Sequence, residues 1–311
     1  MTNPRFLLLP DVPDWAFDVN LRDMAEYVPD FDFVFHYMKD GAPPDSLFDS
    51  CEAGAYLPWH AQFKHRPELM ARLHSSLRAQ SLWPAEKPHV TAEDAEYVNG
   101  FRAFHVVTRR AYDALKPHCP RLSFLTNPVN MRKFPRASGL GRDVVFSWNG
   151  RAGHTCLGAR DLDVKGFRSF IEPAMKATGA PLVVADYDKS RIAHKDMPAW
   201  YRQANVTLSA SLYEGASNSI MEAMASGHAI IGTPVGNLPE IQACQLERFG
   251  VTGILLLRER SVEAITEAVE RLRHEPARVA QMGEINRAEI AARWSWEVWA
   301  DHYAQFLGAI Q

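Results

Sequence analysis

Cysteine is scarce in this sequence. Four cysteines stand among 311 residues, and no two of them form a Cys-x-x-Cys pair. They are Cys51, Cys119, Cys156 and Cys244. Such wide spacing is typical neither of a disulfide framework nor of a structural zinc site. We therefore expect all four to be reduced and structural.

Long hydrophobic runs and an excess of one charge are also missing. The apolar run Phe6–Leu9 is too short for a signal peptide or a membrane span. The 34 basic and 37 acidic residues are interspersed and give a net charge of −3, which provides no general attraction for nucleic acid. We expect a cytoplasmic protein with no transmembrane segment and no nucleic-acid partner. Balanced charge leaves peripheral contact with a membrane open.

Apolar residues, in contrast, are plentiful. At 47% of 311 residues they suffice for more than one core, and a two-domain α/β chain is the natural solution. Strand candidates separated by helical stretches suggest that the first domain is doubly wound. These candidates are Phe6–Leu9, Phe31–Phe35, Phe104–Val107 and Leu122–Leu125. The glycine-containing stretch Arg136–Arg142 precedes a new apolar strand and is the expected linker.

One segment of the second half is the most informative part of the sequence. Val206–Ser211 alternates and is rich in β-branched residues, which predicts a strand, and Ala229–Ile231 predicts the next one. Between them a helix is expected to begin near Asn218 or Ser219 and to end at Gly227. In such a unit, backbone N–H groups and the helix dipole favour anions beyond the carboxyl end of the strand. The segment therefore predicts a site for a diphosphate.

Two carboxylates belong to this segment. Glu214 lies in the turn after the strand, and Glu222 lies one turn into the helix. Because helical side chains lean toward the N-terminus, Glu222 is expected to face the edge that carries Glu214. One carboxylate would then accept from sugar hydroxyls and the other from ribose hydroxyls. The alternative is a capping box in which Glu222 binds the backbone N–H of Ser219.

The segment from Ser209 to Glu240 resembles the donor-binding signature of family 4 of the retaining GT-B glycosyltransferases, which carries a Glu-x7-Glu motif. Upstream, Val144–Arg151 resembles the family's strand ending in Gly-Arg, and Lys165-Gly166 resembles its Lys-Gly step before a helix. The following segments also keep the family's order: Thr233–Gly236, Gly253–Leu256 and Trp294–Trp296. The resemblance covers roughly half of the chain.

The resemblance implies an α/β architecture of the GT-B type, with two Rossmann-like doubly wound domains facing across a cleft. Residues 1–138 would form the acceptor-side domain and residues 139–296 the nucleotide-sugar donor-binding domain. A C-terminal helix over about residues 297–311 would pack back on the first domain. The alternative is that its aromatic face packs on the second domain, a face made of Trp296, Trp299, Tyr303 and Phe306. The expected hinge is near Gly139 and Gly141.

The activity implied by the resemblance is that of a retaining hexosyltransferase of glycan biosynthesis. It would move a sugar from a nucleotide diphosphate sugar, UDP- or GDP-linked, to a hydroxyl of a glycan, lipid-linked or small-molecule acceptor. No cofactor and no metal are implied, because fixed cations and a helix N-terminus supply the charge that Mg²⁺ would bring. Two alternatives stay open: a GT-B sugar phosphorylase, and a non-catalytic interaction protein that binds a nucleotide sugar.

Site residues carry over from the resemblance position by position. Arg151 and Lys165 would hold the donor diphosphate and neutralise charge on the leaving group, and Glu214 would contact the donor sugar. Glu222 would bind the ribose. The turn would approach sugar and phosphates through its backbone, with Gly215, Ala216, Ser217, Asn218 and Ser219. Plainer alternatives are a loop arginine at position 151 and a solvated lysine at position 165.

The acceptor side has weaker candidates. Asp11, Trp15 and His36 lie at or just beyond predicted strand ends, where a turn aspartate, a packed tryptophan and a satisfied histidine are the ordinary alternatives. His60 and His65 could overhang the acceptor site, but their spacing fits no metal motif.

The chain also departs from the family's pattern. Pro10–Trp15 replaces a glycine-rich turn, which leads us to expect unusual acceptor recognition. The stretch from Val183 to Trp200 is short where the family has a further helix and strand, so the base is unresolved. Asn237 replaces a second glycine near the donor site, where it could alter sugar selection.

Overall fold

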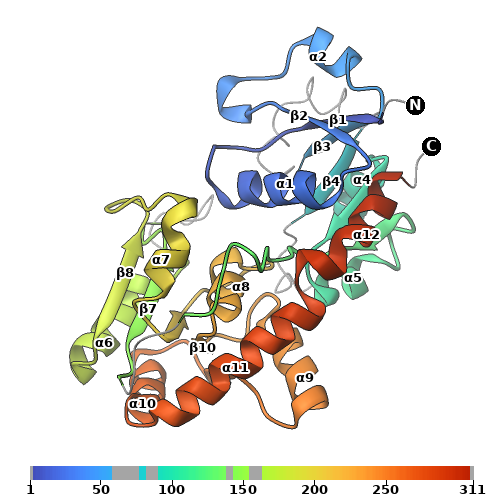
Figure 1. Cartoon of the computed structure of the whole chain (residues 1–311). Coiled ribbons are helices and arrows are strands. Elements are labelled where there is room, and N and C mark those ends of the chain that lie inside the picture. Colours follow the sequence, from blue (N-terminus) through green and yellow to red (C-terminus); the bar gives the residue numbers. More distant parts are fainter. Residues whose placement is uncertain (1–2, 58–76, 82–89, 138–142, 154–162, 309–311) are drawn as a thin grey trace. The chain divides into compact units, whose positions relative to one another are not determined.

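The computed structural model describes residues 3–57, 77–81, 90–137, 143–153 and 163–308. The chain divides into two compact units (Figure 1). Unit 1 comprises Met1–Pro128 and Trp296–Gln311, and unit 2 comprises Val129–Ser295. Each unit is built on its own parallel β-sheet.

Unit 1 has a six-stranded sheet in the order β2-β1-β3-β4-β5-β6. Its strands are β1 (Arg5–Leu8), β2 (Asp32–Phe35), β3 (Gly54–Leu57), β4 (Leu77–Ser81), β5 (Ala103–Val106) and β6 (Leu122–Phe124). The four strands expected from sequence agree with β1, β2, β5 and β6 to within one residue at each end. The strands β3 and β4 were missed. The sequence of β4, Leu-Arg-Ala-Gln-Ser, has no β-branched or aromatic residue, so its pairing with β3 and β5 decides its conformation.

The helices of unit 1 include the last one in the chain. They are α1 (Ala16–Tyr27), α2 (Asp45–Asp49), α4 (Ala92–Asn99), α5 (Arg109–Leu115), α12 (Trp296–Gly308) and the 3₁₀ turn η1 (Met38–Asp40). The red helix α12 lies beside α1 (Figure 1). Its Trp296, Tyr303 and Phe306 share an apolar cluster with Phe6 and Leu8 of β1. The alternative in which this face packs on the second domain is therefore wrong.

Unit 2 has a five-stranded sheet in the order β11-β10-β9-β7-β8. Its strands are β7 (Phe146–Gly150), β8 (Leu182–Asp186), β9 (Val206–Ser209), β10 (Ala229–Gly232) and β11 (Ile254–Leu256). The chain moves outward from β7 to β8 in one direction and from β9 to β11 in the other. The neighbours β7 and β9 therefore form the topological switch point, where doubly wound sheets bind ligands beyond the carboxyl ends of their strands.

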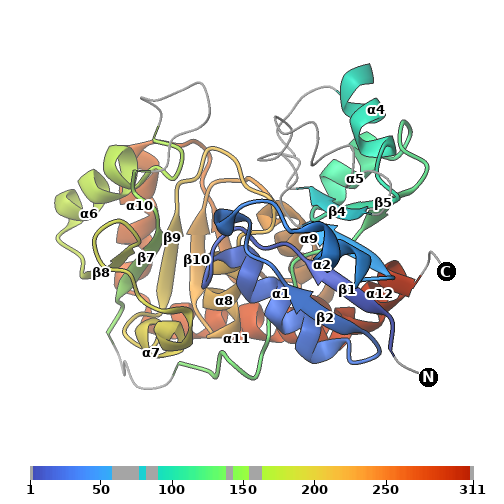
Figure 2. The same cartoon turned by 90° about the horizontal axis from the view of Figure 1, so that it is seen from above.

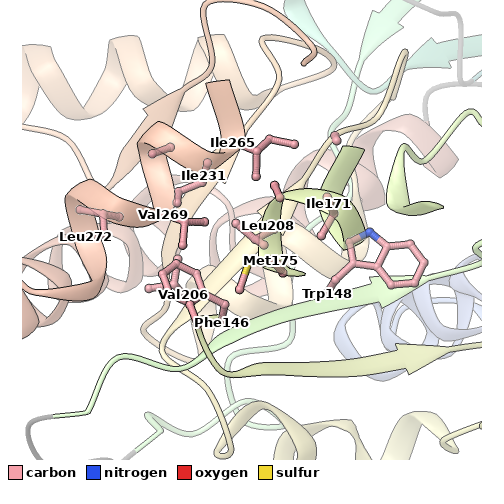
Figure 3. Packing of buried hydrophobic residues seen from close by; sticks show 14 of the residues in the cluster. Phe146, Trp148, Ile171, Met175, Val206, Leu208, Ile231, Ile265, Val269 and Leu272 are labelled. Atoms are coloured by element: carbon pink, nitrogen blue, oxygen red, sulfur yellow. The ribbon is translucent and has the colours of Figure 1, made fainter. Parts of the chain in front are cut away.

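Helices cover both faces of this sheet (Figure 2). They are the π-helical turn η3 (Phe167–Ile171), α6 (Glu172–Thr178), the 3₁₀ turn η4 (His194–Asp196), α7 (Met197–Tyr201), α8 (Asn218–Ala225), α9 (Leu238–Phe249), α10 (Val262–Arg273) and α11 (Pro276–Arg293). Figure 3 shows the core on one face, where Phe146, Leu208 and Ile231 of the strands meet Met175 of α6 and Val269 of α10. The opposite face packs on α7, α8, α9 and α11.

The boundary between the units differs from the expected one. The division falls between Pro128 and Val129, ten residues before the predicted boundary at 138/139. Residues 129–137 belong to unit 2 because they pack on it: the N–H of Val129 donates to the carbonyl of Trp294 at 2.9 Å, and Phe134 is buried among α7 and α8. Gly139 and Gly141, the predicted hinge, lie outside the described residues.

Two further observations concern membrane spans and cysteines. None of the described helices is both long and apolar enough to cross a membrane. Cys51, Cys119 and Cys244 are free thiols, whereas Cys156 lies outside the described residues.

Candidate functional site

Two loops meet at the switch point of unit 2. One loop, residues 163–166, leads from the β7 side into η3, and the other, residues 210–217, leads from β9 into α8. The N–H of Leu212 donates to the carbonyl of Val164 at 2.8 Å. Gly166 has φ +69°, and a Cβ at this position would lie 2.3 Å from the carbonyl oxygen of Ala210. Only glycine allows the two loops to approach this closely.

Lys165 and Glu214 form an ion pair across these loops. Lys165 Nζ lies 2.5 Å from Glu214 Oε1, and the hydroxyl of Ser211 donates to the same oxygen at 2.8 Å. The lysine side chain is 27% exposed and the glutamate side chain 17%. The structure thus brings together two of the predicted site residues in a half-buried position that solvent and a ligand can reach.

The loop that carries Lys165 is held at its base by Asp163. The carboxylate of Asp163 accepts from the N–H of Gly166 at 2.8 Å and from the N–H of Ser169 at 2.9 Å. These N–H groups begin the helical segment and have no partner within it, so the aspartate acts as its cap. Lys165 therefore projects from an anchored turn.

Arg151 follows β7 and is tied to the end of β8. Its Nε donates to Asp188 Oδ1 at 2.8 Å, and both side chains are partly exposed. Asp186, which is buried, accepts from the N–H groups of Ala152 and Asp188 and joins the two strand ends. Both predicted cations thus have a carboxylate partner, which an incoming anion has to displace or share.

Glu222 lies on the inner side of α8. The helix begins at Asn218 with Ser217 at the N-cap, so Glu222 is its fifth residue. A capping box needs the acidic residue at the third position, so that alternative does not apply. Glu222 Oε1 lies 2.9 Å from His194 Nε2, and Oε2 lies 3.2 Å from the hydroxyl of Tyr201.

His194 and Tyr201 were not found by sequence reasoning. The Tyr201 hydroxyl lies 2.9 Å from the carbonyl of Ser219 and 3.1 Å from Asn149 Nδ2, which joins β7 to α8. Burial, followed by the charge of Glu222, raises the pKa of Tyr201 well above its ordinary value. The tyrosine therefore stays protonated and donates. No spacing signals such a network, because its members come from separate elements.

The predicted donor turn packs on the loop after β10. Gly236 has φ +61°, and a Cβ there would lie 2.2 Å from the carbonyl oxygen of Gly215. The N–H of Asn237 donates to the same oxygen at 3.1 Å. Asn237 is buried, and its Nδ2 lies 3.2 Å from Met221 Sδ. Any influence of Asn237 on the site is thus exerted through the turn, since its side chain contacts α8.

The remaining turn residues start α8. Ala216 is buried, and the hydroxyls of Ser217 and Ser219 lie 3.1 Å apart. Asn218 is the first helical residue. The N–H groups at this end of α8 are directed outward along the helix axis, which suits an anion.

The acceptor-side candidates belong to unit 1. Asp11, three residues after β1, lies by the β1/β3 switch point of its sheet and is 7% exposed. Within the described part of the chain neither of its carboxylate oxygens has a hydrogen-bond partner. Burial raises the pKa of Asp11, and the nearby N–H groups of Val12 and Asp11 oppose the rise.

The two other acceptor-side candidates differ in their surroundings. His36 Nε2 lies 3.1 Å from the carbonyl oxygen of Gly41, and Trp15 occupies the N-cap position of α1. His60 and His65 lie outside the described residues.

Comparison with known proteins finds a segment of unit 2 that is similar to a family of sugar transferases. Residues 177–275 match the family described as glycosyl transferases group 1. This segment includes Glu214 and Glu222 but neither Arg151 nor Lys165. A curated relative, the MMP α-(1→4)-mannosyltransferase of Mycolicibacterium hassiacum, is 29% identical over 120 residues, which are 38% of this chain. The alignment spans 28% of that relative's length.

Solved structures resemble the whole chain. Sucrose-phosphate synthase from Thermosynechococcus elongatus has a TM-score of 0.74 at 14% identity, with 99% of each chain covered. HepE from Anabaena, solved with UDP and glucose, has a TM-score of 0.68 at 12% identity, with 99% of this chain and 100% of HepE covered. The chain therefore has the GT-B fold, and its second unit contains a glycosyl transferase group 1 segment.

Proposed function

We propose that this protein is a retaining GT-B glycosyltransferase of family 4, which moves a hexosyl group from a nucleotide diphosphate sugar to an acceptor hydroxyl in glycan biosynthesis. The observation that carries the proposal is the ion pair between Lys165 and Glu214 at the switch point of unit 2. A cation and a carboxylate side by side match the two parts of the donor, its anionic diphosphate and its hydroxyl-bearing sugar. The group 1 match supports sugar transfer.

Lys165 and Arg151 bind the diphosphate in this proposal. Fixed positive charge stabilises the negative charge that develops on the leaving group. In the free protein Glu214 and Asp188 hold the two cations in place. When donor enters, Lys165 exchanges its carboxylate partner for a phosphate oxygen, and Glu214 accepts from a hydroxyl of the sugar. The leaving phosphate takes the acceptor proton, so no separate general base, metal or cofactor is required.

The ribose and the phosphates have further partners in unit 2. Glu222, positioned by His194 and Tyr201, accepts from the ribose hydroxyls. The turn Gly215–Ser219 contributes the N–H groups at the start of α8 to the phosphates and sugar. The nucleotide is UDP or GDP, and the UDP complex of HepE makes UDP the first choice for a test.

Unit 1 takes the acceptor side in this proposal. The acceptor is a glycan, a lipid-linked sugar or a small molecule, and Asp11, Trp15 and His36 are its candidate contacts. Asp11 is the strongest of the three, because its buried carboxylate is left with no partner among the described residues and so suits hydroxyl donors.

Thermal denaturation with UDP, GDP, ADP and dTDP tests the donor site directly. A ligand at about a hundred times its Kd raises stability by about 2.7 kcal/mol. One nucleotide should stabilise the wild type and the control variant Glu263→Gln, which changes an exposed carboxylate on α10, and should stabilise Glu222→Gln much less. That nucleotide then defines the donor series for transfer assays, with the anomeric configuration of the product followed by NMR.

The other outcomes separate the alternatives. If no nucleotide binds and turnover depends on inorganic phosphate, the protein is a sugar phosphorylase. If a nucleotide sugar binds tightly but is neither transferred nor hydrolysed, the protein is a binding protein. An inverted product contradicts the retaining assignment alone.

A further inference from the structure

Arg260 links the two loops of the candidate site through hydrogen bonds to their backbone carbonyls. It lies between β11 and α10 and is partly buried. Its Nε donates to the carbonyl of Ala210 at 2.6 Å, and its Nη2 donates to the carbonyls of Asp163 and Val164, the latter at 3.2 Å. One guanidinium thus binds three backbone oxygens.

These oxygens belong to the loops that carry the ion pair. Asp163 and Val164 directly precede Lys165, and Ala210 lies on the loop that leads to Glu214. A side chain at Gly166 would clash with the same carbonyl oxygen of Ala210. The contact of Arg260 therefore falls where the two loops are closest.

The guanidinium also packs on an aromatic ring. Its carbon lies 4.5 Å from the ring centroid of Phe170, which belongs to the first helical turn after Lys165. Burial lowers the pKa of Arg260, and the Asp163 carboxylate opposes this effect, but an arginine stays charged in a protein. A planar guanidinium with donors in a fixed fork sets the spacing of its acceptors, which a lysine ammonium cannot do.

We propose that Arg260 is a positioning residue that fixes the distance between the Lys165 loop and the Glu214 loop, so that diphosphate and sugar are engaged together. This inference rests on the proposed function. Arg260 acts through the loops and does not touch the substrate. Its removal leaves three carbonyls without their common donor and lets the loops separate, and displacements of about 1 Å at such sites cost up to about a hundredfold in rate.

The chain offers a matched control two residues away. Arg258 lies in the same loop and is exposed. Arg258→Met removes the same charge from unit 2 without breaking a contact to either loop. Arg260→Lys keeps the positive charge but loses the planar set of N–H donors. A general electrostatic role would therefore be retained in Arg260→Lys, whereas a positioning role would not.

A double-mutant cycle on nucleotide affinity tests the inference. Binding of UDP and of GDP is measured by calorimetry for the wild type, Arg260→Met, Lys165→Met and the double variant, with Arg258→Met as control. We expect Arg260→Met to weaken binding about tenfold, Arg258→Met to leave it unchanged, and the double variant to be no weaker than Lys165→Met alone. Arg260→Lys should lie near Arg260→Met, and it serves as the test variant if Arg260→Met does not fold.

The outcomes distinguish this inference from the proposed function. If the losses of nucleotide affinity in Arg260→Met and Lys165→Met multiply in the double variant, the positioning role is overturned. Wild-type affinity in Arg260→Met would overturn it as well. Either result would leave the donor site in place. Absence of UDP and GDP binding in the wild type would overturn the proposed function itself.

Discussion

Lys165 Nζ and Glu214 Oε1 lie 2.5 Å apart although 49 residues separate them in the chain. They meet because β7 and β9 are neighbours in a parallel sheet, so the loops at their carboxyl ends share one edge. The glutamate holds the lysine side chain in place and balances its charge. The pair thus links the two loops through their side chains.

Replacing Lys165 with alanine should lower turnover by orders of magnitude. The change removes charge that stabilises the leaving group, a contribution typically worth about 3–4 kcal/mol. The fold should persist, because the pair is partly exposed. Steady-state kinetics and thermal melting separate these effects, with Lys176→Ala as control, since Lys176 is an exposed lysine paired with Glu172 on α6. Near-normal turnover in Lys165→Ala would exclude the assigned role.

Glu222→Gln should weaken binding of the nucleotide but leave binding of pyrophosphate unchanged. Glutamine keeps the shape of the side chain but loses the charge that accepts from ribose hydroxyls, so we expect UDP or GDP affinity to fall about tenfold. Pyrophosphate has no ribose, and its affinity should stay unchanged. Calorimetric titration of both ligands gives the result. Equal losses for both ligands, or a fall in melting temperature alone, would assign Glu222 a structural role in the network with His194 and Tyr201.

Asp11→Asn should stabilise the protein near neutral pH and should raise the KM for the acceptor. The pKa of Asp11 is raised by burial, so the folded state resists ionisation of this carboxyl. The resulting destabilisation is absent below the unfolded value of 3.8, grows as pH rises above that value, and is complete above the folded pKa. Asparagine removes it, so melting temperature should rise near about pH 8 and change little near about pH 4.

The acceptor half of that prediction decides whether Asp11 is functional. A buried polar group that is kept at a cost to stability is typical of binding sites. The acceptor KM should rise in Asp11→Asn with donor affinity unchanged. Unchanged acceptor kinetics together with higher stability would leave Asp11 as a structural feature of unit 1.

His228 should make unit 2 sensitive to acid. It is buried between Thr207 and the carbonyl of Tyr201, and burial lowers its pKa to about 4 from the usual 6.5. Between these values the unfolded chain binds a proton that the folded chain does not. The contribution of His228 to stability is therefore complete above pH 6.5 and falls by about 1.4 kcal/mol per pH unit between pH 6.5 and about 4.

The variant His228→Gln tests this slope. Denaturant unfolding measured across this pH range should show a slope smaller by about one proton than in the wild type. His118→Gln is the control, because it replaces an exposed histidine in the same way. An unchanged slope in His228→Gln would show that this histidine does not contribute to the acid sensitivity.

Strands with a clear apolar run could be predicted from sequence to within one residue in unit 1, because burial on both faces of a parallel sheet demands such runs. Glu214 could be placed at the end of a strand for the same reason, whereas Lys165 was assigned to the site only by the family resemblance, and its pairing with Glu214 was not predicted. β4 was missed, because its conformation follows from pairing with its neighbours and not from its own residues.

Contacts between side chains on separate elements could not be predicted from the sequence. Arg260, His194 and Tyr201 bind partners on other elements of the fold, and no fixed sequence spacing predicts such hydrogen bonds. The domain boundary was misplaced for a related reason. The glycines near position 140 marked a plausible linker, but the buried side chain of Phe134 assigns the preceding residues to unit 2.

The discontinuity of unit 1 has a consequence for biosynthesis. Trp296, Tyr303, Phe306 and Leu307 of α12 fill part of the core around β1, so the first unit to be translated is completed by residues made after all of unit 2. Unit 2 is continuous, so its whole sequence is synthesised before that of unit 1 is complete. Unit 1 can therefore complete its core only after α12 has been synthesised, and until then the apolar face around β1 stays uncovered and prone to aggregation.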